Sequence, residues 1–135
     1  MREVRFIQRL ENFKQSNKNL VETADFVKGH ELSKFYIMSL VQAFEMSFEL
    51  AWKTIKDYLE YVGIIADSPR TAIKEGFSTK LIIDGQKWIE MMEARNKTSH
   101  TYKEEFAIEI AREILDVYIP LILDLEKTLE SKING

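Results

Sequence analysis

One short stretch, residues 95–102, gathers most of the side chains in this sequence that could carry out chemistry. Arg95 stands five residues before His100, and Tyr102 follows two residues later. Histidine both accepts and donates protons near neutral pH, and arginine presents a fixed fork of donors that suits a phosphate group. Because no metal ligands stand beside the pair, the combination favours phosphodiester chemistry over other reactions.

Arg95 and His100 can act together only if the helix that carries Arg95 ends before His100, or if two copies of the segment meet. On an ideal helix, a separation of five residues leaves two side chains about 140° apart. Thr98, Ser99 and Thr101 favour a break, because such residues form helices poorly and bond locally to the backbone. Taken alone, Arg95 and His100 also suit a structural role at a helix end, beside its last carbonyl groups.

The size and composition of the chain predict one helical domain that spans residues 1–135. Apolar residues make up 45% and charged residues 30% of the 135 residues, as in ordinary globular proteins. The 5 glycines and 2 prolines are too few for a turn-rich β fold. The chain contains no cysteine, which excludes disulfides and thiolate metal sites.

Charge and hydropathy restrict the partners that we expect. Residues 1–5 show no signal-peptide core, and the longest apolar run, residues 117–123, is too short to span a bilayer. We therefore expect a cytoplasmic protein with no membrane partner. The net charge of −3 gives no global basic field, so RNA binding would depend on a local patch. Four cations could form one, although glutamates are interspersed among them: Lys87, Arg95, Lys97 and Lys103.

Apolar residues recur at steps of three and four through the first half of the chain. The first stripe runs from Phe6 to Val27 and predicts a helix that ends near Gly29, with Asn17 as a polar position at a loosely packed layer or an interface. The second helix is predicted from about Glu31 to Val62, followed by Gly63. It is apolar on more than one face, which is typical of a helix that packs on several neighbouring helices, or on its own domain and a partner chain.

The second half of the chain predicts three further helices. Ser68-Pro69, with Ser68 as the cap, marks the start of a short helix that ends near Gly76 or a few residues later, and Asp84-Gly85 opens the next one. The last helix is predicted from about Lys103 to Lys132, with a kink at Pro120. No segment alternates with period two for long enough to argue a sheet. We expect an all-α fold, an antiparallel four-helix up-and-down bundle with an additional short helix.

Other residues that could carry chemistry favour structural roles. His30 has no plausible partner in the sequence, and Trp52 and Trp88 suit the core or an interface better than a base-stacking platform. Two histidines and scattered carboxylates predict neither a metal site nor a cofactor. Four residues of the second helix have the spacing of a solvated ladder of ion pairs: Glu45, Glu49, Lys53 and Lys56.

Three segments resemble the nucleotidyltransferase substrate-binding protein family, a branch of the HEPN superfamily that contains HepT-like toxins. They are FEMSFELAWK at residues 44–53, SPRTA at residues 68–72, and residues 88–102. The resemblance covers nearly the whole chain in order, and Arg-x4-His-x-Tyr is its most specific part. It implies a compact helical bundle that forms a homodimer and is usually encoded beside a small nucleotidyltransferase of the minimal (MNT) type.

The resemblance also implies roles for the residues of the motif. HEPN relatives with this motif act as metal-independent ribonucleases, often as toxins of toxin–antitoxin pairs. His100 would serve as general base or acid at the ribose 2′-hydroxyl, and Arg95 would stabilise the charge on the transition state. Two motifs that meet across a dimer axis would form one cleft. Tyr102 matches a tyrosine that, in some members, the partner enzyme blocks by AMPylation, the transfer of AMP.

Three hypotheses about function remain open from the sequence. The first is a ribonuclease toxin that a cognate MNT nucleotidyltransferase neutralises. The second is a non-catalytic subunit that binds substrate or nucleotide in a two-component nucleotidyltransferase, and the third is a helical interaction module. The first hypothesis requires that expression of the protein arrests growth and that His100→Ala abolishes this arrest. The second requires nucleotide transfer that occurs only when both proteins are mixed. The third predicts that neither activity depends on Arg95 or His100.

Overall fold

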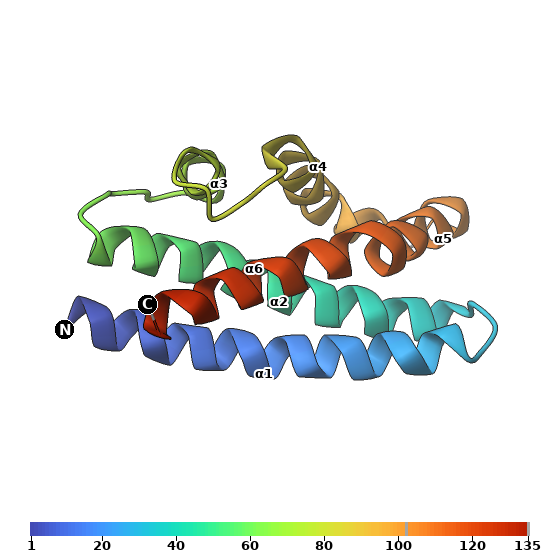
Figure 1. The fold of residues 1–135 in the computed structure, drawn as a ribbon. Coiled ribbons are helices and arrows are strands. Elements are labelled where there is room, and N and C mark those ends of the chain that lie inside the picture. Colours follow the sequence, from blue (N-terminus) through green and yellow to red (C-terminus); the bar gives the residue numbers. More distant parts are fainter. Residues whose placement is uncertain (102, 135) are drawn as a thin grey trace.

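The computed structural model describes residues 1–101 and 103–134, and these residues form helices without any strand. Two long helices, α1 (Arg2–Lys28) and α2 (Lys34–Tyr61), make an antiparallel hairpin, and α6 (Ile119–Asn134) packs along both of them (Figure 1). The shorter helices α3 (Pro69–Ser78) and α4 (Gly85–Asn96) lie against α2 on the side away from α1. The all-α fold class predicted from the sequence is confirmed.

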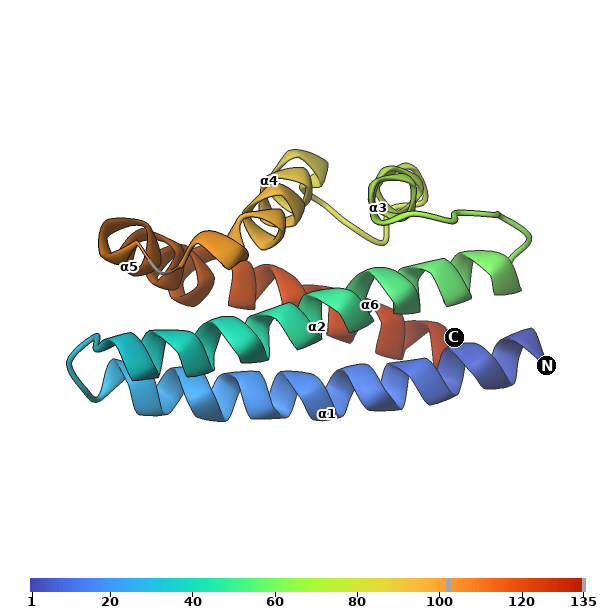
Figure 2. The ribbon, with the colours of Figure 1, turned by 180° about the vertical axis from the view of Figure 1, so that it is seen from behind.

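The views in Figures 1 and 2 show how the short helices are oriented. The long helices α1, α2 and α6 run along the length of the molecule, whereas α3 is seen nearly end-on and α4 is steeply inclined. The chain passes from α4 to α5 (Glu104–Glu113) at one end of the molecule, near the link between α1 and α2. The segment that carries the Arg/His motif therefore lies at the junction of α4 and α5.

Capping residues set the starts of three helices. The side chains of Ser33, Ser68 and Asp84 accept hydrogen bonds from the backbone N–H groups three residues later, at 3.4, 3.2 and 3.0 Å. Ser68 was predicted as a cap, and Asp84-Gly85 was predicted as a helix start. The second helix was predicted from Glu31, which is wrong by three residues because Ser33 acts as its cap. Gly63 follows α2 with a φ of 95°, a conformation that glycine adopts without strain.

The last helix is interrupted before Pro120 rather than at it. A π-helical turn (Ile114–Tyr118) separates α5 from α6, and the Ile119 N–H donates to the carbonyl oxygen of Ile114, five residues back. Pro120 lacks an N–H group and its ring crowds the preceding turn, so the wider turn takes up the irregularity there. The predicted disturbance exists, but it lies one turn upstream.

The helices enclose one apolar core, to which every helix contributes. Trp88 and Phe44 are buried in it, and Trp52 lies half-buried at its edge, as expected for core tryptophans. Asn17 is also buried, and its Nδ2 donates to Glu126 Oε1 of α6 at 2.9 Å. Asn17, predicted as a polar position at a loosely packed layer or an interface, forms a polar link between α1 and α6 of the same chain.

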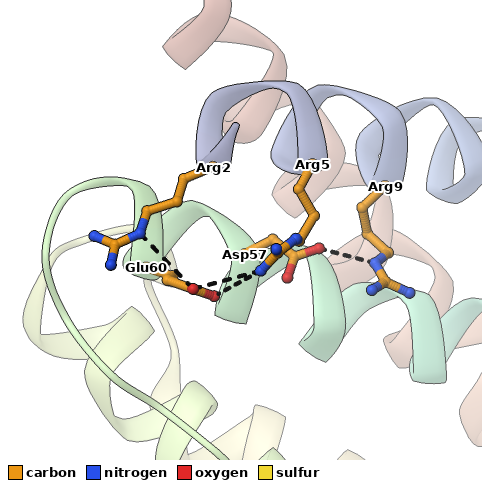
Figure 3. Close-up of polar contacts among 5 residues, drawn as sticks. All are labelled: Arg2, Arg5, Arg9, Asp57 and Glu60. Atoms are coloured by element: carbon orange, nitrogen blue, oxygen red, sulfur yellow. Dashed lines mark hydrogen bonds and ion pairs between the residues drawn. The ribbon is translucent and has the colours of Figure 1, made fainter.

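A row of arginines joins α1 to the end of α2 (Figure 3). Arg9 Nε lies 2.9 Å from Oδ2 of the buried Asp57. Arg5 Nη1 and Arg2 Nε lie 3.4 and 3.9 Å from Glu60 Oε1, where the side chains are more exposed. These contacts hold the N-terminal end of α1 against the C-terminal end of α2.

Candidate functional site

The helix that carries Arg95 ends between Arg95 and His100, as the sequence predicts. Helix α4 ends at Asn96, and a 3₁₀ turn (Thr98–His100) follows it. The Thr98 hydroxyl contacts the carbonyl oxygen of Arg95 at 2.8 Å, the local bonding expected of threonine at a helix end. The 140° separation of an unbroken helix therefore does not apply to this pair.

Arg95 points from the last turn of α4 toward α2, where it contacts Glu45. Its Nη1 lies 3.2 Å from Glu45 Oε2 and 3.3 Å from Thr98 Oγ1. Thr98 Oγ1 and Glu45 Oε2 are 2.5 Å apart, so the three side chains form a closed triangle of polar contacts. We refer to Glu45, Arg95 and Thr98 as the arginine clamp.

Burial differs among the three members of the clamp. Thr98 is buried, whereas about a third of each of the Arg95 and Glu45 side chains is exposed (33% and 32%). Arg95 Nε is buried and has no hydrogen-bond partner among the described residues. A buried donor without a partner costs about 1–3 kcal/mol, so the clamp holds the guanidinium in place despite an unsatisfied Nε–H group.

His100 occupies the exposed end of the 3₁₀ turn. Its backbone N–H donates to the Lys97 carbonyl oxygen at 3.0 Å, and its own carbonyl oxygen accepts from the Lys103 N–H at 3.1 Å. The backbone around the imidazole is therefore ordered by local hydrogen bonds, while the side chain is at the surface. Tyr102, predicted as a site of modification, lies outside the described residues.

Glu45 is a site residue that the sequence reasoning missed. It was predicted as part of a solvated ladder with Glu49, which is wrong for Glu45 because this carboxylate faces Arg95 and Thr98. Glu49 instead accepts a hydrogen bond from Trp52 Nε1 within α2 at 2.7 Å. A signal was present in the sequence, because Val41 and Phe48, at i−4 and i+3 from Glu45, are apolar. Glu45 therefore borders the buried face of α2.

A groove of about 450 Å³ lies between α4 and α5, beside the clamp. Tyr118 is among its lining residues, and the Tyr118 hydroxyl donates to Glu113 Oε2 at 3.0 Å. Burial and the Glu113 carboxylate raise the pKa of the Tyr118 phenol above its usual value. Charged side chains of both signs line the groove, so a uniformly basic patch does not form here: Lys87, Lys97, Glu90, Glu93, Glu109 and Glu113.

The second histidine, predicted to be structural or solvent-exposed, is exposed and packs on a neighbouring ring. The His30 ring stacks on Phe26 with centroids 4.2 Å apart, and its Nδ1 lies 2.7 Å from the Phe26 carbonyl oxygen. His30 thus packs on the end of α1. In residues 1–101 and 103–134, no three histidine, aspartate or glutamate side chains are grouped as metal ligands. None of the helices in that part of the chain is long and apolar enough to cross a membrane.

Comparisons with known proteins agree with this architecture. Residues 8–131 match the family described as nucleotidyltransferase substrate binding protein like. A Haemophilus influenzae protein named probable ribonuclease HepT is 32% identical over 96 residues, which are 67% of this chain and 66% of that relative. The aligned region therefore spans just under two thirds of the relative's length.

Two solved structures share the fold. One is a Haemophilus influenzae protein whose structure reveals the fold of a substrate-binding domain of a nucleotidyltransferase. It has a TM-score of 0.78 and 25% identity, and the match covers 90% of this chain and 98% of that one. The other is a Thermus thermophilus protein with a TM-score of 0.74 and 26% identity, for which the match covers 91% of this chain and 99% of that one. The chain belongs to the nucleotidyltransferase substrate-binding protein family.

Proposed function

We propose that this protein is a HEPN-type, metal-independent ribonuclease and the toxin of a toxin–antitoxin pair. The observation that carries the proposal is the end of α4 at Asn96, because Arg95 and His100 are then not held about 140° apart on one unbroken helix. The printed name of the relative, probable ribonuclease HepT, supports the same activity.

The proposed reaction divides the chemistry between the two side chains. His100 takes the proton of a ribose 2′-hydroxyl, whose oxygen attacks the adjacent phosphorus. The bond from phosphorus to the 5′-oxygen breaks, and that oxygen receives a proton as it leaves, which gives a 2′,3′-cyclic phosphate and a 5′-hydroxyl. Arg95 stabilises the additional negative charge on the phosphate oxygens in the transition state.

A second copy of the chain supplies the second proton-transfer group in this proposal. The start of α2 exposes Phe35 and Met38, which are 75% and 51% accessible. A groove of about 310 Å³ continues from Met38 to Thr101, the residue directly after His100. Packing of two copies over this apolar surface would bury it and would bring the two His100 residues toward one cleft.

Two matched surface variants test the dimer. Met38→Glu places a charge on the proposed interface, and Ile83→Glu places one on an 88% exposed residue between α3 and α4. We expect wild-type protein and Ile83→Glu to sediment as dimers at micromolar concentration and to cleave RNA. Met38→Glu should sediment as a folded monomer without cleavage. A monomeric wild-type protein that still cleaves RNA would rule out the shared cleft.

Cleavage itself is tested with purified protein and RNA in the presence of EDTA. We expect wild-type protein to leave 2′,3′-cyclic phosphate ends, and Arg95→Ala and His100→Ala to lose at least about 100-fold in rate. His100 is exposed and Arg95 lies at a helix end, so both variants should keep the helical circular dichroism of the wild type. Activity that disappears with chelation would contradict the metal-independent mechanism.

The partner in this proposal is a cognate MNT-type nucleotidyltransferase, which acts with the toxin in the cytoplasm, where RNA and ATP are found. The partner transfers AMP from ATP to Tyr102, so that an O–P bond forms and pyrophosphate leaves. The anionic group then excludes the substrate phosphate beside His100. The family description, which concerns substrate binding for nucleotidyltransferases, supports the pairing.

Intact mass and peptide mapping test this control point. After incubation with the partner, ATP and Mg²⁺, we expect one AMP on wild-type protein and none on Tyr102→Phe, which remains an active ribonuclease. Tyr61→Phe is the control, because Tyr61 is exposed at the far end of α2 and should not affect the modification. Transfer to Tyr61, or an unmodified wild-type chain beside an active partner, would contradict the assignment.

The second candidate function is a non-catalytic subunit that presents substrate or nucleotide to a nucleotidyltransferase. The fold shared with a nucleotidyltransferase substrate-binding domain favours it. In that case Arg95 binds a phosphate without cleaving it. The wild-type chain then leaves RNA intact, and nucleotide transfer to a third molecule occurs only when both proteins are mixed.

A further inference from the structure

We infer that Glu45 is a positioning residue that sets the guanidinium of Arg95 for a substrate phosphate, with Thr98 as the second contact. This inference rests on the proposed function, because it assigns the phosphate to Arg95. Glu45 belongs to α2 and the motif to the α4–α5 junction, so the contact fixes the motif to the long hairpin. The packing of the two helices thereby determines where the arginine points.

The first argument is the pattern of contacts on the guanidinium. Both contacts of Arg95, at 3.2 and 3.3 Å, are made by the same nitrogen, Nη1. In a planar guanidinium, the hydrogens of Nε and Nη2 point along the other edge, which is the one that holds two oxygens of a phosphate side by side. Nε has no hydrogen-bond partner among the described residues. The clamp therefore leaves the edge suited to a phosphate without a partner, although atoms of the protein cover Nε.

The second argument is the cost of an unsatisfied donor. Arg95 Nε is buried and unpaired in the described part of the chain, which costs free energy because its N–H has lost hydrogen bonds to water. An arginine at a helix end could turn its side chain into water and avoid that cost, but Glu45 and Thr98 hold it in place. A phosphate oxygen that moves the atoms covering Nε would satisfy it, most strongly in the transition state, where the phosphate oxygens carry additional negative charge.

The third argument separates position from charge. A carboxylate 3.2 Å from Arg95 weakens the attraction of the guanidinium for a phosphate. If charge were the dominant effect, removal of Glu45 would increase activity. If position is dominant, removal lets a long side chain sample many rotamers and decreases activity. We expect position to dominate, because Thr98 and Glu45 both contact Nη1 and Thr98 is buried.

Steady-state cleavage of RNA by the intact protein distinguishes these effects. For Glu45→Ala we expect kcat to fall about 100-fold with KM changed less than about threefold, since the misplaced group acts mainly on the transition state. Glu45→Gln keeps an oxygen at the same reach and should recover kcat to within about tenfold of the wild type. Glu49→Ala is the matched control, because Glu49 lies one turn along α2 and contacts Trp52; its kcat should be unchanged.

Thr98 offers a second matched pair. Thr98→Ser keeps the hydroxyl that contacts Arg95, whereas Thr98→Val keeps the shape and removes the hydroxyl. We expect Thr98→Val, but not Thr98→Ser, to lower kcat. Thermal melting of each variant identifies a loss of fold, and a variant that is unfolded at the assay temperature is replaced by its conservative counterpart.

A measurement without RNA keeps this inference separate from the proposed function. With ¹⁵N-labelled arginine, the Arg95 Nε–H signal of the wild type should be sharp and should shift on titration with inorganic phosphate. In Glu45→Ala it should broaden through exchange with water. If wild-type protein fails to cleave RNA but shows this behaviour, the proposed ribonuclease is wrong and the positioning role stands. Glu45→Ala with wild-type or higher kcat, or with an unaltered Arg95 signal, would overturn the inference.

Discussion

The ion pair between Arg9 and Asp57 gives a sharp test of what holds α1 to α2. Asp57 is only 2% exposed, and its Oδ2 lies 2.9 Å from Arg9 Nε (Figure 3). The change Arg9→Ala leaves this carboxylate without its counter-charge. Loss of one partner of a fully buried pair costs about 3–5 kcal/mol of folding free energy, because an unpaired buried charge remains.

The expected loss lies at or just below the lower end of that range. The Arg9 side chain is 34% exposed, so truncation lets water reach the carboxylate and recover part of its solvation. We therefore expect Arg9→Ala to lower the free energy of unfolding by about 2–3 kcal/mol. For 135 residues, the unfolding entropy is about 0.28 kcal/mol/K, so Tm should fall by about 7–11 °C.

The assay is urea and thermal unfolding followed by circular dichroism, at one fixed protein concentration because a dimer would make stability concentration-dependent. Arg5→Ala is the control. Arg5 and Glu60 are 54% and 31% exposed, and their atoms are 3.4 Å apart, so its loss should cost less than about 1 kcal/mol. Equal losses for Arg9→Ala and Arg5→Ala would refute the reasoning from burial.

Four further outcomes are expected. Gly63→Ala should destabilise the fold by about 1–2 kcal/mol through its φ of 95° alone, since no atom lies within 4 Å of the added carbon. Lys80→Gly should stabilise the fold slightly, because Lys80 has a φ of 66° that glycine adopts without strain. Urea titration measures both changes. Because folding raises the pKa of Tyr118, the stability that its neutral phenol contributes is complete below the unfolded pKa of about 10 and declines above it. Unfolding at pH 9 and 11 should show a loss of up to about 1 kcal/mol that Tyr118→Phe lacks. Asn17→Ala should cost about 1–3 kcal/mol in thermal melts, because Glu126 loses its donor.

The sequence by itself determined the helices and most of their limits. Ser68-Pro69 and Asp84-Gly85 begin α3 and α4 as predicted, and the break after Arg95 occurs where Thr98 and its neighbours predict it. These features depend on hydrogen bonds between residues three or four positions apart, so the local sequence contains both partners. The π-helical turn shows the limit of local rules, because Pro120 predicts a disturbance but the turn forms upstream of it.

Only the tertiary structure decided which side chains meet across helices. Arg9 and Asp57 are 48 residues apart in sequence, Thr98 and Glu45 are 53 apart, and Asn17 reaches across to α6. Each of these contacts depends on how one helix is rotated and shifted against another, which the packing of the whole core fixes. The same local sequence pattern allows a carboxylate at the border of an apolar face to point either to solvent or to a neighbouring helix. Glu45 therefore has the local pattern of a surface residue, and only the packing of α4 beside α2 brings Arg95 to it.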